Sequence, residues 1–257
     1  MQVNRQKEIT DIREYRARRR RAGSTRWILL LVLLVACLFA GYFFARSDFF
    51  AVAHIEVSGN DHIASERLIE LSGFQIGGSL FAVTPRYAEE WLRVEPRVKS
   101  AEVRRVWPDT VLIEVEERQP VALLNAGLVM IEIDAEGRIL ARYYVISEMD
   151  LPLISGVDLS ETPTSAGSWI EGEGIDAALE ILRSLPADAA DIGEIDVTNT
   201  QYIKLYTMNG TEIRLGDSTD FAAKYLAYST ILDDAQRNSD RLIHYIDVSI
   251  YTKPVFY

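Results

Sequence analysis

An uncharged apolar run near the N-terminus constrains this chain more than any other feature. From Trp27 to Ala45 the sequence is WILLLVLLVACLFAGYFFA, which contains no Asp, Glu, Lys or Arg. A helix of about 20 such residues is long enough to cross the hydrocarbon core of a bilayer. Aromatic residues stand at both ends of the run, where the two membrane interfaces would lie. We therefore predict a transmembrane helix over residues 27–45, in preference to a core helix of a soluble domain.

The charges on either side of this run predict its orientation. Residues 1–26 hold nine Lys and Arg against three Asp and Glu, a net charge of +6. Because positively charged flanks stay in the cytoplasm, we expect residues 1–26 to form a cytoplasmic basic tail. The cluster Arg18–Arg21 would also suit a nucleic-acid patch. Its position beside the apolar run favours an anchor on anionic lipid headgroups instead.

Two kinds of cleavage would remove this anchor. A signal peptidase needs small residues before its cut, whereas this run ends mostly in aromatic residues. The segment LVAC that ends at Cys37 resembles a lipobox, but a lipidated cysteine is usually followed by polar residues, and here Leu38 and Phe39 follow. We expect the helix to stay uncut, with most of the chain on the far side of the membrane.

The rest of the chain is acidic and has no second cysteine. The whole sequence carries a net charge of −11, so the residues after Arg26 carry −17. A body with this charge repels phosphate backbones, which argues against nucleic-acid binding. Cys37 is the only cysteine, so no intramolecular disulfide can form, and the outer part must be held together by its hydrophobic cores.

The first outer region, residues 49–118, has the expected element order β-α-α-β-β. We expect strands at 52–57, 98–107 and 110–117, and helices at 66–72 and from 85 to before Pro96. Ser65 and Thr84 are the expected helix caps, and Pro85 suits a first helical position. In residues 110–117 apolar and charged side chains alternate, as in a strand with one buried face. Trp107-Pro108 is expected to turn a hairpin and to supply a large apolar anchor.

The second outer region, residues 119–257, is predicted to be a mostly antiparallel β domain with flanking helices. We expect strands at 121–124, 128–133, 138–144, 194–197, 202–208, 211–215, 242–250 and 255–257, helices at 176–185 and 219–236, and a loop at 151–156. Asn209-Gly210 between two of these strands is a strong hairpin signal. The fold class is therefore α+β, with one N-terminal transmembrane helix.

The sequence offers no constellation that would support catalysis. The histidines His54, His62 and His244 have no second ligand at metal-binding spacing. There is no nucleophile elbow, phosphate loop or dinucleotide fingerprint. Paired carboxylates such as Glu116-Glu117 diverge, because adjacent side chains do not face one another. We expect no metal, no cofactor and no enzyme activity; a membrane-bound hydrolase stays a minor alternative.

Several segments resemble one family closely. They are residues 55–60 (IEVSGN), 96–103 (PRVKSAEV) and above all 104–122 (RRVWPDTVLIEVEERQPVA), with thinner matches at 133–137, 151–156, 210–216, Lys224 and 245–248. Together they resemble the FtsQ/DivIB family of bacterial cell-division proteins, and the first region resembles that family's POTRA domain. The motif residues are expected to hold the fold rather than to carry out chemistry.

This resemblance implies a non-enzymatic membrane scaffold of the divisome. Such a protein sits in the bacterial cytoplasmic membrane at the division septum, with its bulk extracytoplasmic or periplasmic. It binds bitopic partners like FtsB and FtsL, and other divisome proteins through its POTRA domain. Through these contacts it helps to regulate septal peptidoglycan synthesis. A POTRA-bearing protein-transport or envelope-assembly component remains the alternative, although such proteins usually carry tandem POTRA units or a barrel.

The resemblance also implies where a partner binds. A strand of an FtsB-like partner would add beside the C-terminal strand, which we expect to be an open edge. The implied partner-binding residues are Ile246, Asp247, Val248, Ser249, Ile250, Tyr251 and Thr252. The sequence departs from the family pattern at Ser249, where Arg is frequent, and at Gln201, where a basic residue is expected. The ion-pair part of the interface is therefore in question, while its backbone part is not.

Overall fold

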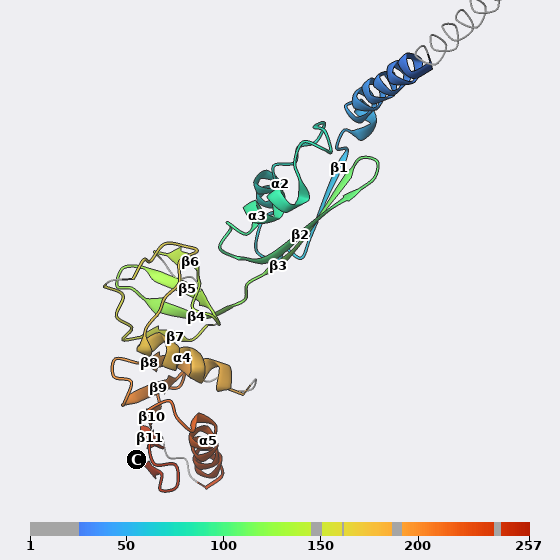
Figure 1. The fold of residues 1–257 in the computed structure, drawn as a ribbon. Helices are drawn as coiled ribbons and strands as arrows, with labels where there is room; N and C mark the ends of the chain where they lie inside the picture. Colours follow the sequence, from blue (N-terminus) through green and yellow to red (C-terminus); the bar gives the residue numbers. More distant parts are fainter. Residues whose placement is uncertain (1–25, 145–150, 161, 187–191, 239–242) are drawn as a thin grey trace, which may run out of the picture.

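The computed structural model describes residues 26–144, 151–160, 162–186, 192–238 and 243–257. The predicted basic tail lies outside these residues, apart from Arg26. Figure 1 shows an elongated molecule in which an N-terminal helix, a small sheet with two helices and a large sheet follow one another.

The N-terminal helix matches the predicted membrane span. It covers Arg26–Ala45, 20 residues with a mean hydropathy of 2.8, and none of its apolar window is buried in the rest of the protein. A core helix of a soluble domain would be mostly buried, so its exposure favours a membrane as its surroundings. A short 3-10 helix, η1 (Asp48–Phe50), follows it.

The small sheet has the predicted β-α-α-β-β order. Its elements are β1 (His54–Ser58), α2 (Ser65–Ser72), α3 (Pro85–Leu92), β2 (Val98–Val106) and β3 (Thr110–Glu117). β3 lies in the middle, parallel to β1 and antiparallel to β2. The alternation in β3 buries Val111, Ile113 and Val115 as expected, and Thr84 caps α3 by accepting a hydrogen bond from the Tyr87 N–H at 3.4 Å.

Two expectations for this region were wrong. Trp107 is 57% exposed, because the β2–β3 hairpin extends beyond the hydrophobic core, so the ring does not anchor that core. The N-cap of α2 is Ala64 rather than Ser65, whose hydroxyl instead accepts a hydrogen bond from Asn60 Nδ2 at 3.1 Å.

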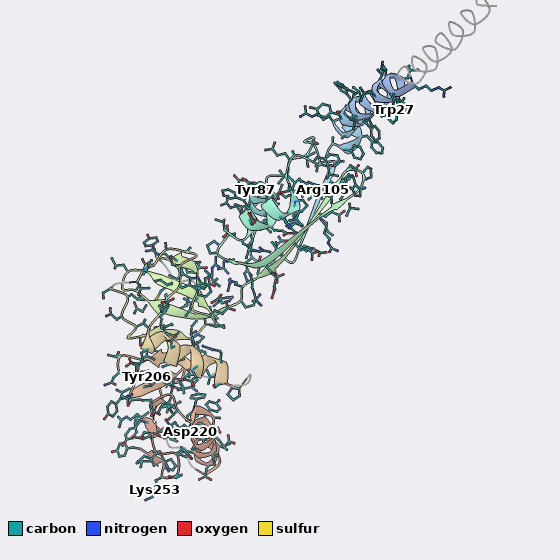
Figure 2. The ribbon with its side chains drawn as sticks, viewed as in Figure 1. Trp27, Tyr87, Arg105, Tyr206, Asp220 and Lys253 are labelled. Carbon is teal, nitrogen blue, oxygen red and sulfur yellow. The ribbon has the colours of Figure 1, made fainter. Side chains whose placement is uncertain are left out.

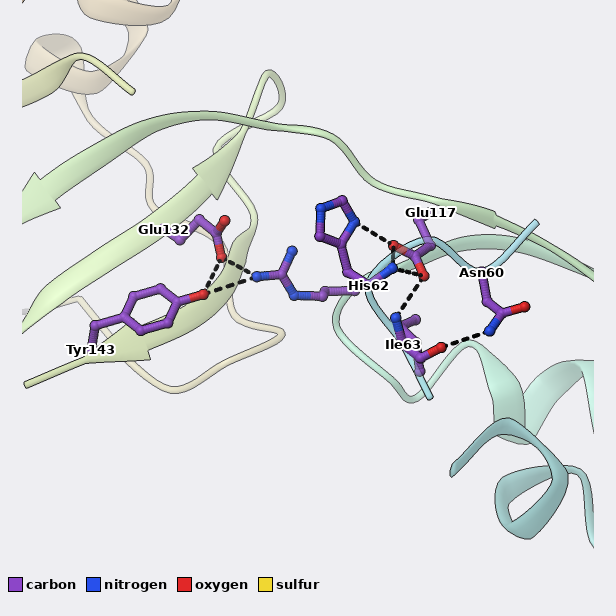
Figure 3. Close-up of polar contacts among 7 residues, drawn as sticks. Asn60, His62, Ile63, Glu117, Glu132 and Tyr143 are labelled. Atoms are coloured by element: carbon purple, nitrogen blue, oxygen red, sulfur yellow. Dashed lines mark hydrogen bonds and ion pairs between the residues drawn. The ribbon is translucent and has the colours of Figure 1, made fainter. Parts of the chain in front are cut away.

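A buried carboxylate ties the end of β3 to the loop before α2 (Figure 3). Glu117 accepts hydrogen bonds from the backbone N–H groups of His62, at 3.0 Å to each oxygen, and of Ile63, at 2.9 Å. The His62 ring Nδ1 lies 3.0 Å from the same carboxylate. Burial by itself would raise the pKa of Glu117, but these hydrogen bonds outweigh it and lower that pKa.

The second region forms one mixed sheet with two helices. Its strands are β4 (Pro120–Asn125), β5 (Met130–Asp134), β6 (Ile139–Tyr143), β7 (Leu153–Ser155), β8 (Ile192–Asp196), β9 (Ile203–Thr207), β10 (Glu212–Gly216), β11 (Tyr245–Asp247) and β12 (Val255–Phe256), and its helices are α4 (Glu173–Ser184) and α5 (Phe221–Asn238). The strand order is β12-β11-β10-β9-β8-β7-β4-β5-β6. One hydrophobic cluster contains buried residues of both helices and of the sheet, so the helices cover this core.

Two segments differ most from their predicted structure. Residues 151–156 were predicted as a loop, but Leu153–Ser155 form β7, which pairs in parallel with β4 and β8 in the middle of the sheet. The expected strand 242–250 is wrong in length: β11 ends at Asp247, and Leu242 lies outside the described residues. The Asp247 carboxylate accepts hydrogen bonds from the Ser249 N–H (3.0 Å) and Oγ (2.6 Å), and this turn ends the strand.

Candidate partner-binding site

The C-terminal edge of the large sheet is β12. β11 pairs in parallel with β10 and antiparallel with β12, so β11 is not the open edge that the sequence suggested. Across the described strands, nothing pairs with the outer side of β12. Lys253, just before it, lies at the end of the molecule farthest from Trp27 (Figure 2).

The hydrogen bonds between β11 and β12 show which backbone groups face outward. The Tyr257 N–H donates to the Tyr245 carbonyl at 3.1 Å, and the Tyr245 N–H donates to the Tyr257 carbonyl at 3.3 Å. Bonded and non-bonded pairs alternate along an antiparallel ladder, so the next pair, Ile246 with Phe256, is non-bonded. The N–H and C=O of Phe256 therefore point away from β11, and a partner strand would meet them there.

Exposed apolar side chains surround this backbone edge. Val255, Phe256 and Tyr257 of the edge and Ile250 and Tyr251 of the preceding turn are all exposed. An exposed apolar patch on a sheet edge is typical of protein-contact sites.

Side-chain stacking connects β12 to β11 and β10. The rings of Tyr245 and Tyr257 stack with centroids 6.2 Å apart, and the Arg214 guanidinium lies 4.1 Å from the centre of the Tyr245 ring. Arg214 also donates to Glu212 at 2.6 Å, and this bond raises the pKa of Arg214. The arrangement holds β12 on the sheet while leaving its outer side free of these contacts.

The seven residues that the resemblance implies for partner binding differ in their exposure and roles. Ile246 and Val248 are completely buried in the core, so their side chains present no exposed surface. Asp247 uses its carboxylate to hold the turn at Ser249. The other four, Ser249, Ile250, Tyr251 and Thr252, are exposed in the turn between β11 and β12.

The two positions that depart from the family pattern meet in space. A Cβ atom built at Gly216 would lie 3.2 Å from Ser249 Cβ and 4.0 Å from the Gln201 carbonyl oxygen. Ser249 and Gln201 therefore both lie close to Gly216 at the end of β10. Neither side chain is basic, so neither of these two positions supplies a cation for an acidic partner.

Sequence reasoning predicted the strand at 255–257 but did not assign it to the site. The sequence did contain a signal for this strand: Val255-Phe256-Tyr257 has high strand propensity. Pro254 stands before it and, because it lacks an N–H, limits strand pairing at that position. The pairing of β12 with β11, which makes β12 the outermost strand, could not be predicted from the sequence.

The edge strand β2 of the small sheet is less available to a partner. β2 forms one edge of the small sheet, but α3 satisfies two of its outward groups. The Val103 N–H donates to Glu89 at 3.0 Å, and the Ala101 carbonyl accepts from Arg93 at 3.4 Å. Across the described ranges, no group of three or more His, Cys, Asp or Glu could hold a metal ion.

The family models and the known proteins that match this chain all have the same family description. Residues 50–118 match the family model "POTRA domain, FtsQ-type", and residues 122–249 match "Cell division protein FtsQ/DivIB, C-terminal". The chain is 32% identical over 225 residues to the cell division protein FtsQ of Syntrophotalea carbinolica, across 86% of this chain and 78% of that protein. This chain belongs to the FtsQ/DivIB family.

A more distant member of the FtsQ/DivIB family matches over a similar length, and a solved domain matches over about half of this chain. The cell division protein DivIB of Bacillus selenitireducens is 27% identical over 244 residues, which covers 90% of this chain and 86% of that protein. The solved extracytoplasmic domain of DivIB from Geobacillus stearothermophilus is 20% identical, covers 49% of this chain and 99% of that one, and has a TM-score of 0.33. Family membership confirms the resemblance and supports a role in cell division, and the one membrane-length apolar helix among the described residues, Arg26–Ala45, fits a single-pass membrane protein.

Proposed function

We propose that this FtsQ/DivIB protein is a non-enzymatic scaffold of the divisome, which binds an FtsB/FtsL-like bitopic partner by strand addition at β12. Its N-terminus lies in the cytoplasm, its two sheets lie outside the cytoplasmic membrane at the septum, and its contacts help to regulate septal peptidoglycan synthesis. The observation that carries the proposal is the edge itself: β12 is outermost in the sheet, with outward backbone groups at Phe256 and exposed apolar side chains around them.

Strand addition fits the chemistry of this edge. The partner's backbone would bond to the outward N–H and C=O of Phe256, and these bonds supply affinity that is independent of side-chain identity. The apolar side chains at Ile250, Val255 and Phe256 would supply the packing. Because Ser249 and Gln201 are neutral, we assign the cation that would meet an acidic partner to the exposed Lys253.

The test compares two substitutions at one position. Phe256→Pro removes the outward N–H as well as the ring, so binding of a purified FtsB-like partner should fall by up to about tenfold from the loss of that one interface hydrogen bond. Phe256→Ala removes the ring but keeps the N–H, so it should retain more binding than the proline variant. Both full-length variants should melt like the parent in detergent, because the bonds between β11 and β12 at Tyr257 are kept.

The outcome that contradicts strand addition is specific. A Phe256→Pro variant that melts like the parent and binds the partner as well as Phe256→Ala would place the interface elsewhere. Val255→Pro serves as the opposite control, because alternation places the Val255 N–H toward Asp247. That change should loosen β12 itself and lower the melting temperature.

Cellular location separates this proposal from the transport alternative. A fluorescent fusion of the intact chain should gather at the division site in dividing cells. A fusion spread evenly around the envelope, together with co-purification of transport rather than division proteins, would favour the POTRA-bearing transport component.

A further inference from the structure

A continuous set of aromatic rings connects the C-terminal end of the N-terminal helix to the tip of the β2–β3 hairpin. We call Phe44, Phe49, Phe50, Phe81 and Trp107 the aromatic platform. Successive ring centroids lie close together: Phe44–Phe49 at 5.8 Å, Phe49–Phe50 at 5.0 Å, Phe50–Phe81 at 5.5 Å and Phe81–Trp107 at 5.4 Å. Phe50 also meets Trp107 edge-on at 5.8 Å, so the rings form one connected surface.

Most of this platform is exposed. Phe44, Phe49, Phe81 and Trp107 are each more than two-fifths exposed, and only Phe50 is partly buried. The core of the small sheet is built from a different set of residues, which includes none of the five. Packing of the fold therefore does not explain the rings, and an exposed apolar patch of this kind marks a contact surface.

The residues beside the platform suit a membrane interface. The Arg46 guanidinium lies 4.8 Å from the centre of the Tyr42 ring, at the end of the N-terminal helix. The Arg105 guanidinium lies 5.7 Å from the centre of the Phe81 ring and donates to the Val83 carbonyl at 2.5 Å. Aromatic rings mixed with Arg are the composition found where a protein meets lipid headgroups.

The length of the helix places the platform at that depth. From Trp27 to Phe44 the helix rises about 26 Å at 1.5 Å per residue, close to the hydrocarbon thickness of about 30 Å. Phe44 would therefore lie at the outer interface when Trp27 lies at the inner one. The hairpin between β2 and β3 points toward the C-terminal end of this helix (Figure 1). Phe50 contacts both Phe44 and Trp107, so Trp107 would lie at about the same membrane depth as Phe44.

We propose that the aromatic platform lies in the outer-leaflet interface of the membrane and binds the lipid headgroup and upper acyl-chain region. The occupant is phospholipid, because the surface is continuous with Phe44 of the membrane helix, and outer-leaflet lipids are its nearest neighbours. The inference depends on the membrane anchor and is independent of strand addition at β12. A helix and a hairpin tip together give the small sheet two points of contact with the membrane, which restrict its tilt.

Tryptophan quenching by brominated lipid tests this proposal on the intact chain. The chain has four tryptophans, so replacing any three with Phe leaves one reporter. In liposomes whose phosphatidylethanolamine and phosphatidylglycerol carry bromine high on the acyl chain, we expect Trp107 to be quenched several-fold more than Trp91. Trp91 is the matched control, because it is also exposed and lies on α3, outside the platform. Trp27 as the only tryptophan reports that the anchor is inserted.

Two further results bear on the inference. Phe49→Ser with Phe81→Ser should reduce the quenching of Trp107 while leaving the melting temperature near that of the parent, because neither ring is in the core. Strong quenching of Trp27 together with quenching of Trp107 no greater than that of Trp91 would overturn the proposal and leave the anchor intact. Shielding of Trp107 only when a partner protein is reconstituted with the chain would also overturn it, in favour of a protein contact. Partner binding at β12 is measured separately, so the two proposals fail independently.

Discussion

A buried lysine in α5 depends on one carboxylate. The Lys224 side chain is only 5% exposed, and its Nζ donates to the Asp217 carbonyl at 2.9 Å and to Asp217 Oδ1 at 2.8 Å. The bond from Lys224, with another from Thr219, lowers the pKa of Asp217 to about 2. A buried ammonium without this partner would be left with an uncompensated charge. The pair therefore contributes both stability and a dependence of stability on pH.

Asp217→Asn should remove that pH dependence. A carboxyl whose folded pKa is depressed stabilises the fold above its ordinary pKa, and loses this contribution as the pH falls through the folded pKa of about 2. The Asp217 side chain is 44% exposed, so screening by solvent reduces the contribution of this ion pair to the free energy of unfolding to about 1 kcal/mol. We expect the variant to be about 1 kcal/mol less stable at pH 7 and to approach the parent as the pH falls from 4 toward 2. Denaturant unfolding in detergent at each pH measures this, and a difference that stays constant with pH would contradict it.

Among the elements, those with a strong local pattern were predictable from the sequence. The alternation in β3 predicted both of its ends, and Pro85 predicted the start of α3, although α3 ends at Leu92, earlier than the expected end before Pro96. Asn209-Gly210 correctly predicted the turn between β9 and β10, where Gly210 takes a φ of 85°. In each case the deciding interactions lie within a few residues, so the sequence contains them.

The short strands were not predictable, because their partners are distant in the sequence. β7 has only three residues, too few for a period, and it is a strand because β4 and β8 flank it. The same holds for the candidate site: the sequence pointed to the C-terminal end of the chain, but the pairing of β11 with β12 decides which backbone groups face outward. Burial of Ile246 and Val248 likewise depends on helices and strands elsewhere in the chain.

The central position of β7 makes its middle residue important for stability. Ile154 is completely buried between β4 and β8. Ile154→Ala should lower the free energy of unfolding by about 2–5 kcal/mol, the cost of lost apolar contact plus the remaining cavity. Leu128→Ala is the control, because Leu128 is 90% exposed and its truncation should have little effect. Equal melting temperatures for the two variants would show that the segment is a surface loop, as the sequence suggested.

For the whole molecule, orientation in the membrane remains a prediction from charge. The net charge of +6 in residues 1–26 favours a cytoplasmic N-terminus. With Cys37→Ser as background, a cysteine at the exposed Asn125 should react with a membrane-impermeant maleimide once any outer membrane is opened. A cysteine at Ser24 should react only after the cytoplasmic membrane is lysed. The reverse pattern would reverse the orientation, and a palmitate label that disappears in Cys37→Ser would favour a lipoprotein.

Two arginines link the small sheet to the large one. Arg97, just before β2, donates to Glu132 of β5 and, at 3.0 Å, to the Tyr143 hydroxyl of β6. Glu132 and Tyr143 are labelled in Figure 3. Arg118 donates to Asp134 at 2.6 Å and to Glu136 at 2.7 Å. The hydrophobic clusters of the two regions share no residue, so polar contacts supply much of the connection between residues 49–118 and 119–257. The division into these two domains itself remains a prediction.

Replacing Arg97 should loosen this connection. Glu132 is almost completely buried, so Arg97→Met would leave a carboxylate without its cation, a change that costs about 3–5 kcal/mol for a buried pair. With spin labels at Glu56 and Leu128 in the Cys37→Ser background, the distance distribution between the two regions should broaden. Lys99→Met is the matched control, because Lys99 pairs with an exposed glutamate inside the small sheet and should leave that distribution unchanged. If both variants keep the parent's narrow distribution, the orientation of the two sheets is set by the chain between β3 and β4 rather than by the ion pair.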